Sequence, residues 1–375
     1  MKFVVQSKTL QTQLQAVSKV MNTKNAMTIL DNFLFIIEGN TLTIVGSDQE
    51  NVMKATMDIE DSDGDGRIAL NAKRLLDLLK EVPEQGLTFL VDEQTLALEI
   101  QFLSGHLNMM AVDANEYPEG DALTGQETRL MLPAAVVQKG IEATIFAVST
   151  ETLRPVMMGI YWDIHNDDIT FVSSDTHKLV RYVNSEVQPG MERSFIIPAK
   201  PAGILRSVIS GEDTEVEVLI GEKNATFTVG RYSLTCRFIK GNYPDYTRVI
   251  PKDNPYEVQV DRAGFLRAVR CIAVSASQAS GLIKFDISED HIHLSASDAD
   301  YALSAEENVP CTYNGSPMTI GFKAQFMVEV LSNLKGETVL LKLCDPSRPG
   351  IFTPEEKQPD EDQLTLLMPM QTFDY

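Results

Sequence analysis

The sequence is poor in cysteine, tryptophan and basic residues. Its 375 residues include four Cys and one Trp, and 32 Lys and Arg stand against 53 Asp and Glu, a formal charge of −21. The cysteines are scattered without a CxxC pair, so we expect reduced thiols, as in a cytosolic protein. The charge argues against a nucleic-acid partner unless the basic residues are concentrated on one surface.

Long apolar runs are also missing. No stretch approaches the ~18 apolar residues of a membrane span. The opening residues, MKFVVQSKTLQTQL, lack the apolar run and cleavage site of a signal peptide. We therefore expect neither a membrane partner nor a signal peptide. An apolar content of 43% over this length predicts two or three globular domains.

A domain-sized repeat runs through the chain. Three segments combine two alternating apolar runs, a turn and a final Ser-Asp pair: NFLFIIEGNTLTIVGSD, MGIYWDIHNDDITFVSSD and GLIKFDISEDHIHLSASD. Their serines are Ser47, Ser174 and Ser297, at steps of 127 and 123 residues. Lys73, Lys200 and Lys323 recur at the same steps, each before an apolar helical pattern. We predict three homologous domains, 1–127, 128–252 and 253–375.

Each repeat shows the same order of elements. Helical apolar spacing predicts a first helix in each repeat (7–27, 132–148 and 260–276) and a second helix (71–84, 198–212 and 320–335). Alternating segments such as TLTIVGS and ITFVSS, bounded by Gly, Asn and Asp, predict strands between and after them. The expected fold class is α+β, with antiparallel sheets and two helices per domain on one face.

The positive charge is concentrated in the predicted helices. These six segments hold 14 Lys and Arg but only 7 Asp and Glu, so the rest of the chain carries a net charge of −28. Helix propensity alone would enrich Glu equally. Charges farther apart than the ~8 Å screening length act almost independently. A basic helical face could therefore meet phosphates on an acidic protein.

The sequence offers little support for catalysis or metal binding. Asp61 to Gly66 resembles the start of a calcium loop, but Ala72 stands where a bidentate Glu is needed, which favours a solvated turn. His291 and His293 share one side of a strand without a third ligand. Ser174, Asp175 and His177 are triad residue types crowded into one turn. We expect no catalytic residue, metal or cofactor.

The chain resembles the bacterial sliding clamps, the beta subunits of DNA polymerase III. The resemblance covers the whole chain, and its most specific motifs are SDTHKL, YPDYTRVIP and LLMPMQ. It implies a head-to-tail homodimer whose six domains form a ring, with sheets outside and helices inside. Duplex DNA would pass through the ring without sequence preference. The implied activity is the tethering of the replicative polymerase, as a non-catalytic processivity factor in the bacterial cytoplasm, at the nucleoid.

The resemblance also implies site residues. Basic DNA contacts fall on Lys24, Lys73, Arg74, Arg154 and Lys200. An apolar cleft for peptides of the polymerase, clamp loader and other partners falls on Met157, Ser174, Thr176, His177, Lys178, Leu179, Pro244, Arg248, Val249, Leu366, Met368, Pro369 and Met370. Methionine adapts to several ligands, which suits such a cleft. From the residues alone, Met368-Pro369-Met370 is more typical of an edge strand packed on a core, and only the resemblance favours a ligand cleft.

The dimer contact is expected between Leu107 and Met109 of one subunit and Ala273 and Val274 of the other. Three departures from the family pattern affect the cleft. Thr176 and Lys178 replace a common Gly and Arg, and Gln371 replaces a basic residue before a longer C-terminus that contains Phe373 and Tyr375.

Two other hypotheses remain open from the sequence. An acidic three-domain protein could bind peptides or glycans as a monomer, with its helices simply covering the sheets. A hydrolase could use Ser174, Asp175 and His177, in which case His177→Ala would abolish turnover.

Overall fold

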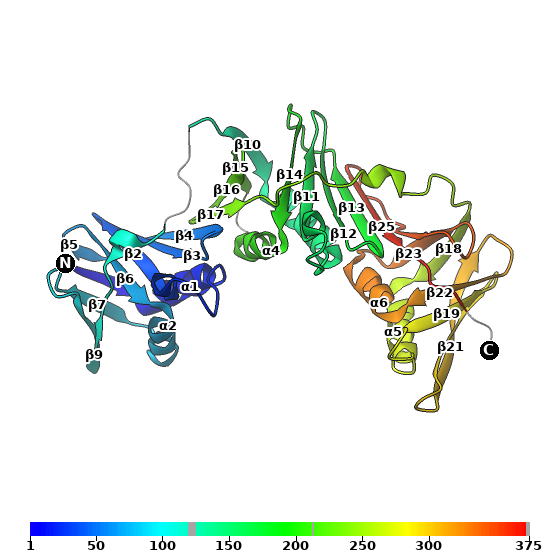
Figure 1. The fold of residues 1–375 in the computed structure, drawn as a ribbon, viewed down its shortest axis with the longest axis horizontal. Coiled ribbons are helices and arrows are strands. Elements are labelled where there is room, and N and C mark those ends of the chain that lie inside the picture. The colour runs from blue at the N-terminus through cyan, green and yellow to red at the C-terminus, as the bar shows by residue number, and fades with distance from the viewer. Residues whose placement is uncertain (119–124, 212–213, 373–375) are drawn as a thin grey trace. The chain divides into compact units, whose positions relative to one another are not determined.

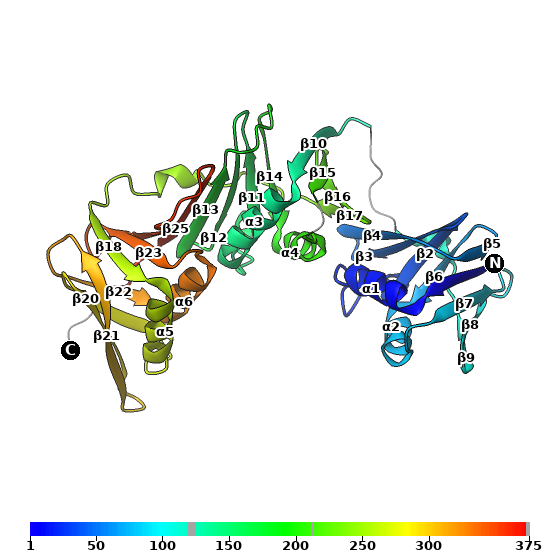
Figure 2. The same cartoon turned by 180° about the vertical axis from the view of Figure 1, so that it is seen from behind.

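The computed structural model describes residues 1–118, 125–211 and 214–372 (Figures 1 and 2). Its six described α-helices confirm the two expected in each repeat: α1 (Ser7–Ser18), α2 (Ala72–Glu81), α3 (Ala134–Thr144), α4 (Ala199–Val208), α5 (Arg262–Ala273) and α6 (Ala324–Asn333). Each helix is shorter than its predicted segment. The helices nevertheless keep the charge bias, with ten Lys and Arg against four Asp and Glu.

The expectation that the first helix reaches residue 27 is wrong. The amide of Lys19 donates to the carbonyl of Ala16, 3.3 Å away, a tighter turn that ends α1. The next residues form a loop that carries Lys24. Short 3-10 helices lie in this connection and in three others: η1 (Thr28–Asp31), η2 (Ala114–Glu116), η3 (Ile145–Ala147), η4 (Pro155–Met157) and η5 (Tyr246–Arg248).

The chain divides into two compact units, which differ from the predicted domains. The first unit holds residues 1–137 and 200–238, and the second holds 138–199 and 239–375. Strand pairing explains the division, because sheets continue from one repeat into the next. The boundaries near 127 and 252 therefore remain a prediction about the repeat and do not mark breaks in the sheets.

The first unit contains two antiparallel sheets. The smaller has the order β5-β1-β7-β8-β9, and the larger has the order β10-β15-β16-β17-β4-β3-β2-β6. Their strands are β1 (Lys2–Gln6), β2 (Asn32–Glu38), β3 (Thr41–Ser47), β4 (Asn51–Asp58), β5 (Asp61–Asp63), β6 (Gly66–Asn71), β7 (Gly86–Val91), β8 (Ala97–Phe102), β9 (Gly105–Met110), β10 (Thr128–Pro133), β15 (Glu215–Ile220), β16 (Asn224–Val229) and β17 (Tyr232–Arg237). Helix α1 packs beside α2 and against β3 and β4.

The second unit contains one twelve-stranded sheet in the order β14-β11-β12-β13-β25-β24-β23-β18-β21-β20-β19-β22. Its strands are β11 (Gly159–Ile164), β12 (Ile169–Ser174), β13 (Lys178–Asn184), β14 (Arg193–Pro198), β18 (Tyr256–Asp261), β19 (Leu282–Ile287), β20 (His291–Asp298), β21 (Leu303–Tyr313), β22 (Met318–Lys323), β23 (Thr338–Leu343), β24 (Gly350–Pro354) and β25 (Glu361–Leu367). Every named strand pair is antiparallel, as expected.

Equivalent strands join successive repeats. The fourth strand of the first repeat, β4, pairs with β17 of the second, with Met53 opposite Leu234. One repeat later, β13 pairs with β25, with Leu179 opposite Leu366. The sequence repeat is therefore matched in the structure by a repeated pairing of strands between successive repeats, which we call a strand junction.

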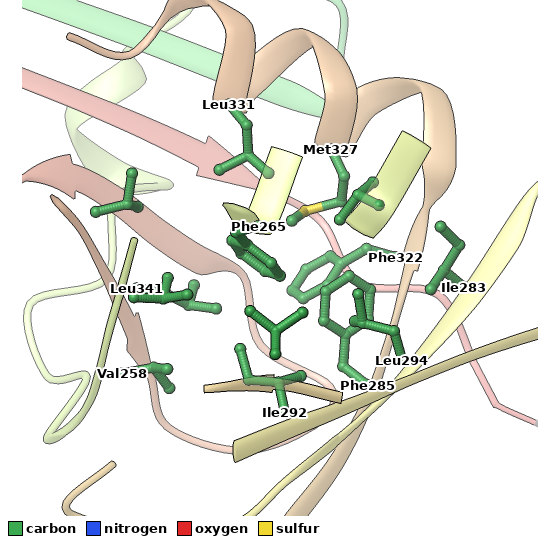
Figure 3. Close-up of a cluster of buried hydrophobic side chains, with 14 of the residues drawn as sticks. Val258, Phe265, Ile283, Phe285, Ile292, Leu294, Phe322, Met327, Leu331 and Leu341 are labelled. Atoms are coloured by element: carbon green, nitrogen blue, oxygen red, sulfur yellow. The ribbon is translucent and has the colours of Figure 1, made fainter. Parts of the chain in front are cut away.

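The core of the third repeat shows how the layers are held (Figure 3). Phe265 of α5, Phe285 of β19 and Phe322 of β22 are fully buried and meet edge to face, with ring centroids 6.0 and 5.4 Å apart. Met327 and Leu331 of α6 close this core from the helical side. Burying each such side chain contributes about 1.5–3 kcal/mol, so these contacts fix both helices on the sheet.

The Ser-Asp pairs form the same local turn in all three repeats. The carboxylates of Asp48, Asp175 and Asp298 each accept the amide two residues ahead, at 3.2, 2.9 and 3.0 Å. Such turns are common for Asp and reverse the chain between strands. No described helix is long and apolar enough to cross a membrane.

Candidate functional site

The turn from Ser174 to Leu179 does not form a catalytic triad. The Ser174 hydroxyl donates to the carbonyl of Lys178 at 2.9 Å, and the Asp175 carboxylate accepts the amides of His177 and Lys178. The His177 ring instead stacks on Phe326, with centroids 5.5 Å apart. Because a triad needs the base at the nucleophile and the acid at the base, this geometry argues against the hydrolase hypothesis.

Lys178 is buried in a polar pocket of its own. Its side chain is 5% exposed, and its Nζ lies 2.5 Å from Asp175 Oδ2 and 2.9 Å from Glu329 Oε2. The ammonium also lies 4.4 Å from the centre of the Phe326 ring. Two carboxylates and an aromatic face stabilise the charge of this lysine away from water. The network joins the β12–β13 turn to α6.

A second cluster, which we call the tyrosine cluster, lies beside this turn. Tyr161 stacks on Tyr243 with centroids 4.8 Å apart, and Tyr246 meets Tyr161 edge-on. These rings pack on Leu179 and Leu366, which are 4% and 3% exposed. The cluster therefore brings together segments near residues 161, 179, 245 and 366.

Asp163 orients two of these rings. The Tyr246 hydroxyl donates to Asp163 Oδ2 at 3.1 Å, and the Tyr161 hydroxyl donates to Oδ1 at 3.3 Å. Burial, followed by the Asp163 carboxylate, raises the pKa of Tyr246. Both phenols therefore stay protonated and keep donating at neutral pH.

The structure brings most of the predicted cleft residues together around the tyrosine cluster. Met368 continues from β25, and its amide donates to the carbonyl of His177 at 2.8 Å. Val249 and Met368 are 54% and 41% exposed, which is high for apolar side chains beside a buried cluster. The remaining exposed members are Thr176, His177, Pro244 and Arg248, the half-buried ones Met157, Pro369 and Met370, and the buried ones Ser174, Lys178, Leu179 and Leu366.

Two predicted cleft residues are tied in less directly. Met157 belongs to η4, beside β11. The residue before it, Val156, lies so close to Gly241 that a Cβ at Gly241 would come within 2.7 Å of the Val156 side chain. Met370 makes a bridge to Gly321 of β22, where its amide donates to the Gly321 carbonyl at 2.8 Å. The C-terminal segment thus pairs with an edge strand at Met370. The hypothesis of a strand packed on a core and the hypothesis of a peptide cleft are therefore both compatible with Met368-Pro369-Met370. Phe373 and Tyr375 lie outside the described residues.

Sequence reasoning missed Tyr161, Tyr246, Phe326 and Glu329. Tyr246 stands inside the quoted motif YPDYTRVIP, so the motif could have revealed it. Tyr161 and Phe326 look like ordinary core positions of a strand and a helix. Only the packing shows that Phe326 lies against His177 and that Tyr161 packs near Leu179.

The predicted DNA contacts lie on α2, on α4 and on loops. Lys73 and Arg74 are exposed in the first turn of α2, and Lys24 and Arg154 are exposed in loops. Lys200 differs, because its Nζ lies 2.6 Å from Asp48 Oδ2. The structure thus leaves four of these five side chains facing solvent without a partner carboxylate in the described ranges.

The acidic and histidine patterns take ordinary structural positions. Asp61 to Asp63 form β5, which pairs with β1, and Asp65 accepts the amide of Gly39 at 2.7 Å. His291 and His293 lie on β20, where their rings meet Asp290 and Asn308. Over residues 1–118, 125–211 and 214–372, no group of three potential ligands could hold a metal ion.

The predicted dimer residues lie on one edge strand and one helix end. Leu107 and Met109 point to one side of β9, the last strand of its sheet, where Met109 is 9% exposed. Ala273 ends α5 and Val274 follows it, 78% exposed. Val274 also borders a surface pocket of about 550 Å³, lined along α5 by Arg262, Ala263, Leu266, Arg267, Arg270 and Cys271.

Comparisons with known proteins agree along the whole chain. The family models for the N-terminal, central and C-terminal domains of the DNA polymerase III beta subunit match residues 1–121, 131–245 and 247–371. The beta sliding clamp of Pseudomonas putida is 25% identical over 372 residues, covering 99% of this chain and all of the relative. That of Staphylococcus aureus is 24% identical and covers both chains fully.

Solved structures give the same result. A sliding clamp from Bartonella birtlesii bound to griselimycin aligns with a TM-score of 0.91 at 25% identity, over 99% of this chain and all of that one. A Streptococcus pyogenes beta subunit shares the fold, with a TM-score of 0.93 at 21% identity over the same shares. Because all three domain models match in order, this chain belongs to the DNA polymerase III beta subunit family, the non-catalytic DNA sliding clamps.

Proposed function

We propose that this chain, as a sliding clamp, contacts DNA through Lys24, Lys73, Arg74 and Arg154, with Lys200 the least available of the predicted set. The support is the separation of charge, since the described helices hold ten Lys and Arg against four Asp and Glu while the chain as a whole carries −21. A few exposed lysines and arginines attract phosphates without holding them, and the acidic remainder repels DNA elsewhere. Sliding needs this weak, sequence-independent contact.

We propose that partner proteins bind at the tyrosine cluster. The single observation that carries this proposal is the exposure of Val249 and Met368, whose amides donate to Tyr246 of the cluster and to His177 of the turn beside it. An extended peptide with one or two apolar side chains could cover Val249 and Met368 and so remove apolar surface from water. The partners are the replicative polymerase, the clamp loader and other proteins that carry such a peptide.

The chain's own strand junctions support a homodimer. Strand β4 pairs with β17, and its equivalent β13 pairs with β25. The third pair in this series would join β21 to β9. Within the described residues, β9 is a sheet edge and the Leu303–Asn308 part of β21 pairs only with β20. A second copy would complete both edges, and two such junctions close a ring of six domains.

The same equivalence gives the register of the proposed dimer contact. Leu234 and Met53, which face each other at the first junction, correspond to Leu107 and Leu303. Leu234 and Met53 are buried, whereas Leu303 is 45% exposed. An exposed leucine at this position is explained if Leu107 of a second subunit covers it. Leu303 was not among the residues expected from the sequence.

The experiment that tests the function compares circular with linear DNA. Protein loaded onto nicked circular duplex should stay bound through a salt wash, and cutting the circle should release it. Release from both substrates alike would contradict topological tethering. A monomer without DNA retention would favour the acidic peptide- or glycan-binding alternative. No feature of the described site supports that alternative.

The cleft is tested separately with griselimycin and with a labelled peptide that carries two adjacent apolar residues. We expect both to bind at the tyrosine cluster, to compete with each other, and to lose affinity in Val249→Asp and Met368→Lys. Unchanged affinity in both variants would place the site elsewhere. A bacterial cytoplasmic location at the nucleoid is the setting we propose.

A further inference from the structure

Lys200 is held differently from the other lysines of the predicted DNA set. Its Nζ donates to the carbonyl of Val20 at 2.5 Å, to Asn22 Oδ1 at 2.9 Å and to Asp48 Oδ2 at 2.6 Å. An ammonium group has three N–H donors, so these acceptors use all of them. The carboxylate also neutralises the charge. No donor remains for a phosphate.

The position of Lys200 makes this arrangement informative. It is the second residue of α4, where the helix dipole disfavours a positive charge. Helix stability therefore does not explain a lysine at this position, whereas the three acceptors do. A second link joins the same elements, because Lys19 Nζ donates to Ser207 Oγ at 2.9 Å. The start and the end of α4 are thus both tied to the residues that follow α1.

The equivalent lysines of the other repeats lack this arrangement. Lys323 lies 4.9 Å from the centre of the Phe326 ring. Lys73 is exposed, and no carboxylate of the described part of the chain pairs with it. Lys73 therefore offers a matched control for Lys200, with the same residue type at the same place of the repeat.

Two of the three acceptors of Lys200 belong to the segment that leads to Lys24. Val20 and Asn22 lie four and two residues before it, and the Asn25 side chain continues the segment by donating to Asp31 Oδ1 at 2.8 Å. We propose that Lys200 is a positioning residue that fixes residues 20–25, and with them the Lys24 side chain, instead of contacting DNA. This inference rests on the proposed DNA contact of Lys24.

Two kinds of measurement test it on the full-length protein. Hydrogen exchange reports the segment directly, and equilibrium binding of a linear duplex over a range of salt reports the phosphate contacts. We expect Lys200→Met and Asp48→Asn to speed amide exchange at residues 20–25, and Lys73→Met to leave it unchanged. Asp48→Asn keeps the oxygen that caps its own turn, but it replaces Oδ2, the acceptor of Lys200, by an NH2 donor, so it removes the charge and this one hydrogen bond.

The DNA measurement separates positioning from direct contact by sign. Removing one phosphate contact lowers the slope of log affinity against log salt by about 0.9, which we expect for Lys24→Met and Lys73→Met. Asp48→Asn should weaken DNA binding although it removes a negative charge. Combined with Lys24→Met, Lys200→Met should cause no further loss of DNA affinity. Combined with Lys73→Met, the two losses of affinity should add fully.

The opposite pattern would overturn the inference. Stronger binding in Asp48→Asn, together with additive losses in Lys200→Met and Lys24→Met, would make Lys200 a direct phosphate contact. Unchanged exchange at residues 20–25 in both variants would show that Lys200 positions nothing. If Lys24→Met and Lys73→Met leave the salt slope unchanged, the DNA assignment fails instead, while the exchange result still decides the role of Lys200.

Discussion

Gln49 and Thr176 occupy the same place in two repeats and share a left-handed backbone, with φ of 81° and 80°. Each follows the Asp of a Ser-Asp turn by one residue. A left-handed conformation costs a residue with a Cβ about 1–2 kcal/mol, and a β-branched residue such as threonine tolerates it poorly. This geometry explains why glycine is common at the position of Thr176.

Thr176→Gly should therefore stabilise the protein. The relief of backbone strain exceeds the entropy that glycine adds to the unfolded chain, and the expected gain is about 1 kcal/mol. Chemical denaturation at equilibrium measures it. Thr176→Ala serves as the control and should gain less, because it removes the branch but keeps the Cβ. Equal stability of the glycine variant and the wild type would contradict strain at this turn.

The Lys178 network predicts an asymmetric cost of substitution. Lys178→Ala leaves Asp175 and Glu329 without their shared cation and should destabilise the protein by about 3 kcal/mol. Glu329→Gln should cost only about 1 kcal/mol, because Asp175 still holds the ammonium. Denaturant unfolding gives both values. The double variant should be no worse than Lys178→Ala, and additive losses would show that the two groups act independently.

His165 predicts a pH-dependent contribution to stability. Its Nδ1 lies 3.0 Å from Glu192 Oε2 and its Nε2 lies 3.4 Å from Asp163 Oδ2. The Glu192 hydrogen bond raises the pKa of His165 despite partial desolvation, and the pKa of Glu192 is lowered in turn. The histidine contribution is complete below the unfolded value of about 6.5 and disappears as pH rises through the folded pKa.

The glutamate sets the lower end of this window. Its lowered pKa gives a contribution that is present above about pH 4.3 and is lost as pH falls through the folded value. His165→Gln should thus lower the melting temperature near about pH 5.5 and have little effect near about pH 8.5. Thermal melts at the two pH values measure the difference. An equal shift at both would show that the ring acts by packing and not by charge.

The proposed dimer predicts that Leu303→Arg and Val274→Arg yield monomers. An arginine at either site would bury an unpaired charge in the contact, which costs several kcal/mol of association energy. Sedimentation of the wild type and the variants measures the mass. Met131→Arg, at a 40% exposed apolar residue of β10, is the control and should remain dimeric. Dimers in both test variants would place the contact on another surface.

Much of the fold could be predicted from the sequence because the three repeats show the same pattern of helices and strands. The six helices and the antiparallel strands recur at matching offsets, so one weak assignment supports the next. The end of α1 was not readable, since residues 19–27 keep helical apolar spacing although the chain turns at Lys19. The strand pairs β4–β17 and β13–β25 could not be predicted from the sequence either, because pairing between repeats depends on which sheet edges meet in space.

The sequence by itself determined the triplication, the separation of charge and the motifs that carry the family resemblance, because each of these is a property of residue order. Only the tertiary structure decided which charges are available and which apolar residues are exposed. Lys73 and Lys200 are the same residue at the same step of the repeat, yet one faces solvent and the other donates to three acceptors. Hydrogen bonding and burial depend on neighbours that lie far away in the chain, such as Asp48, and folding alone brings those neighbours together.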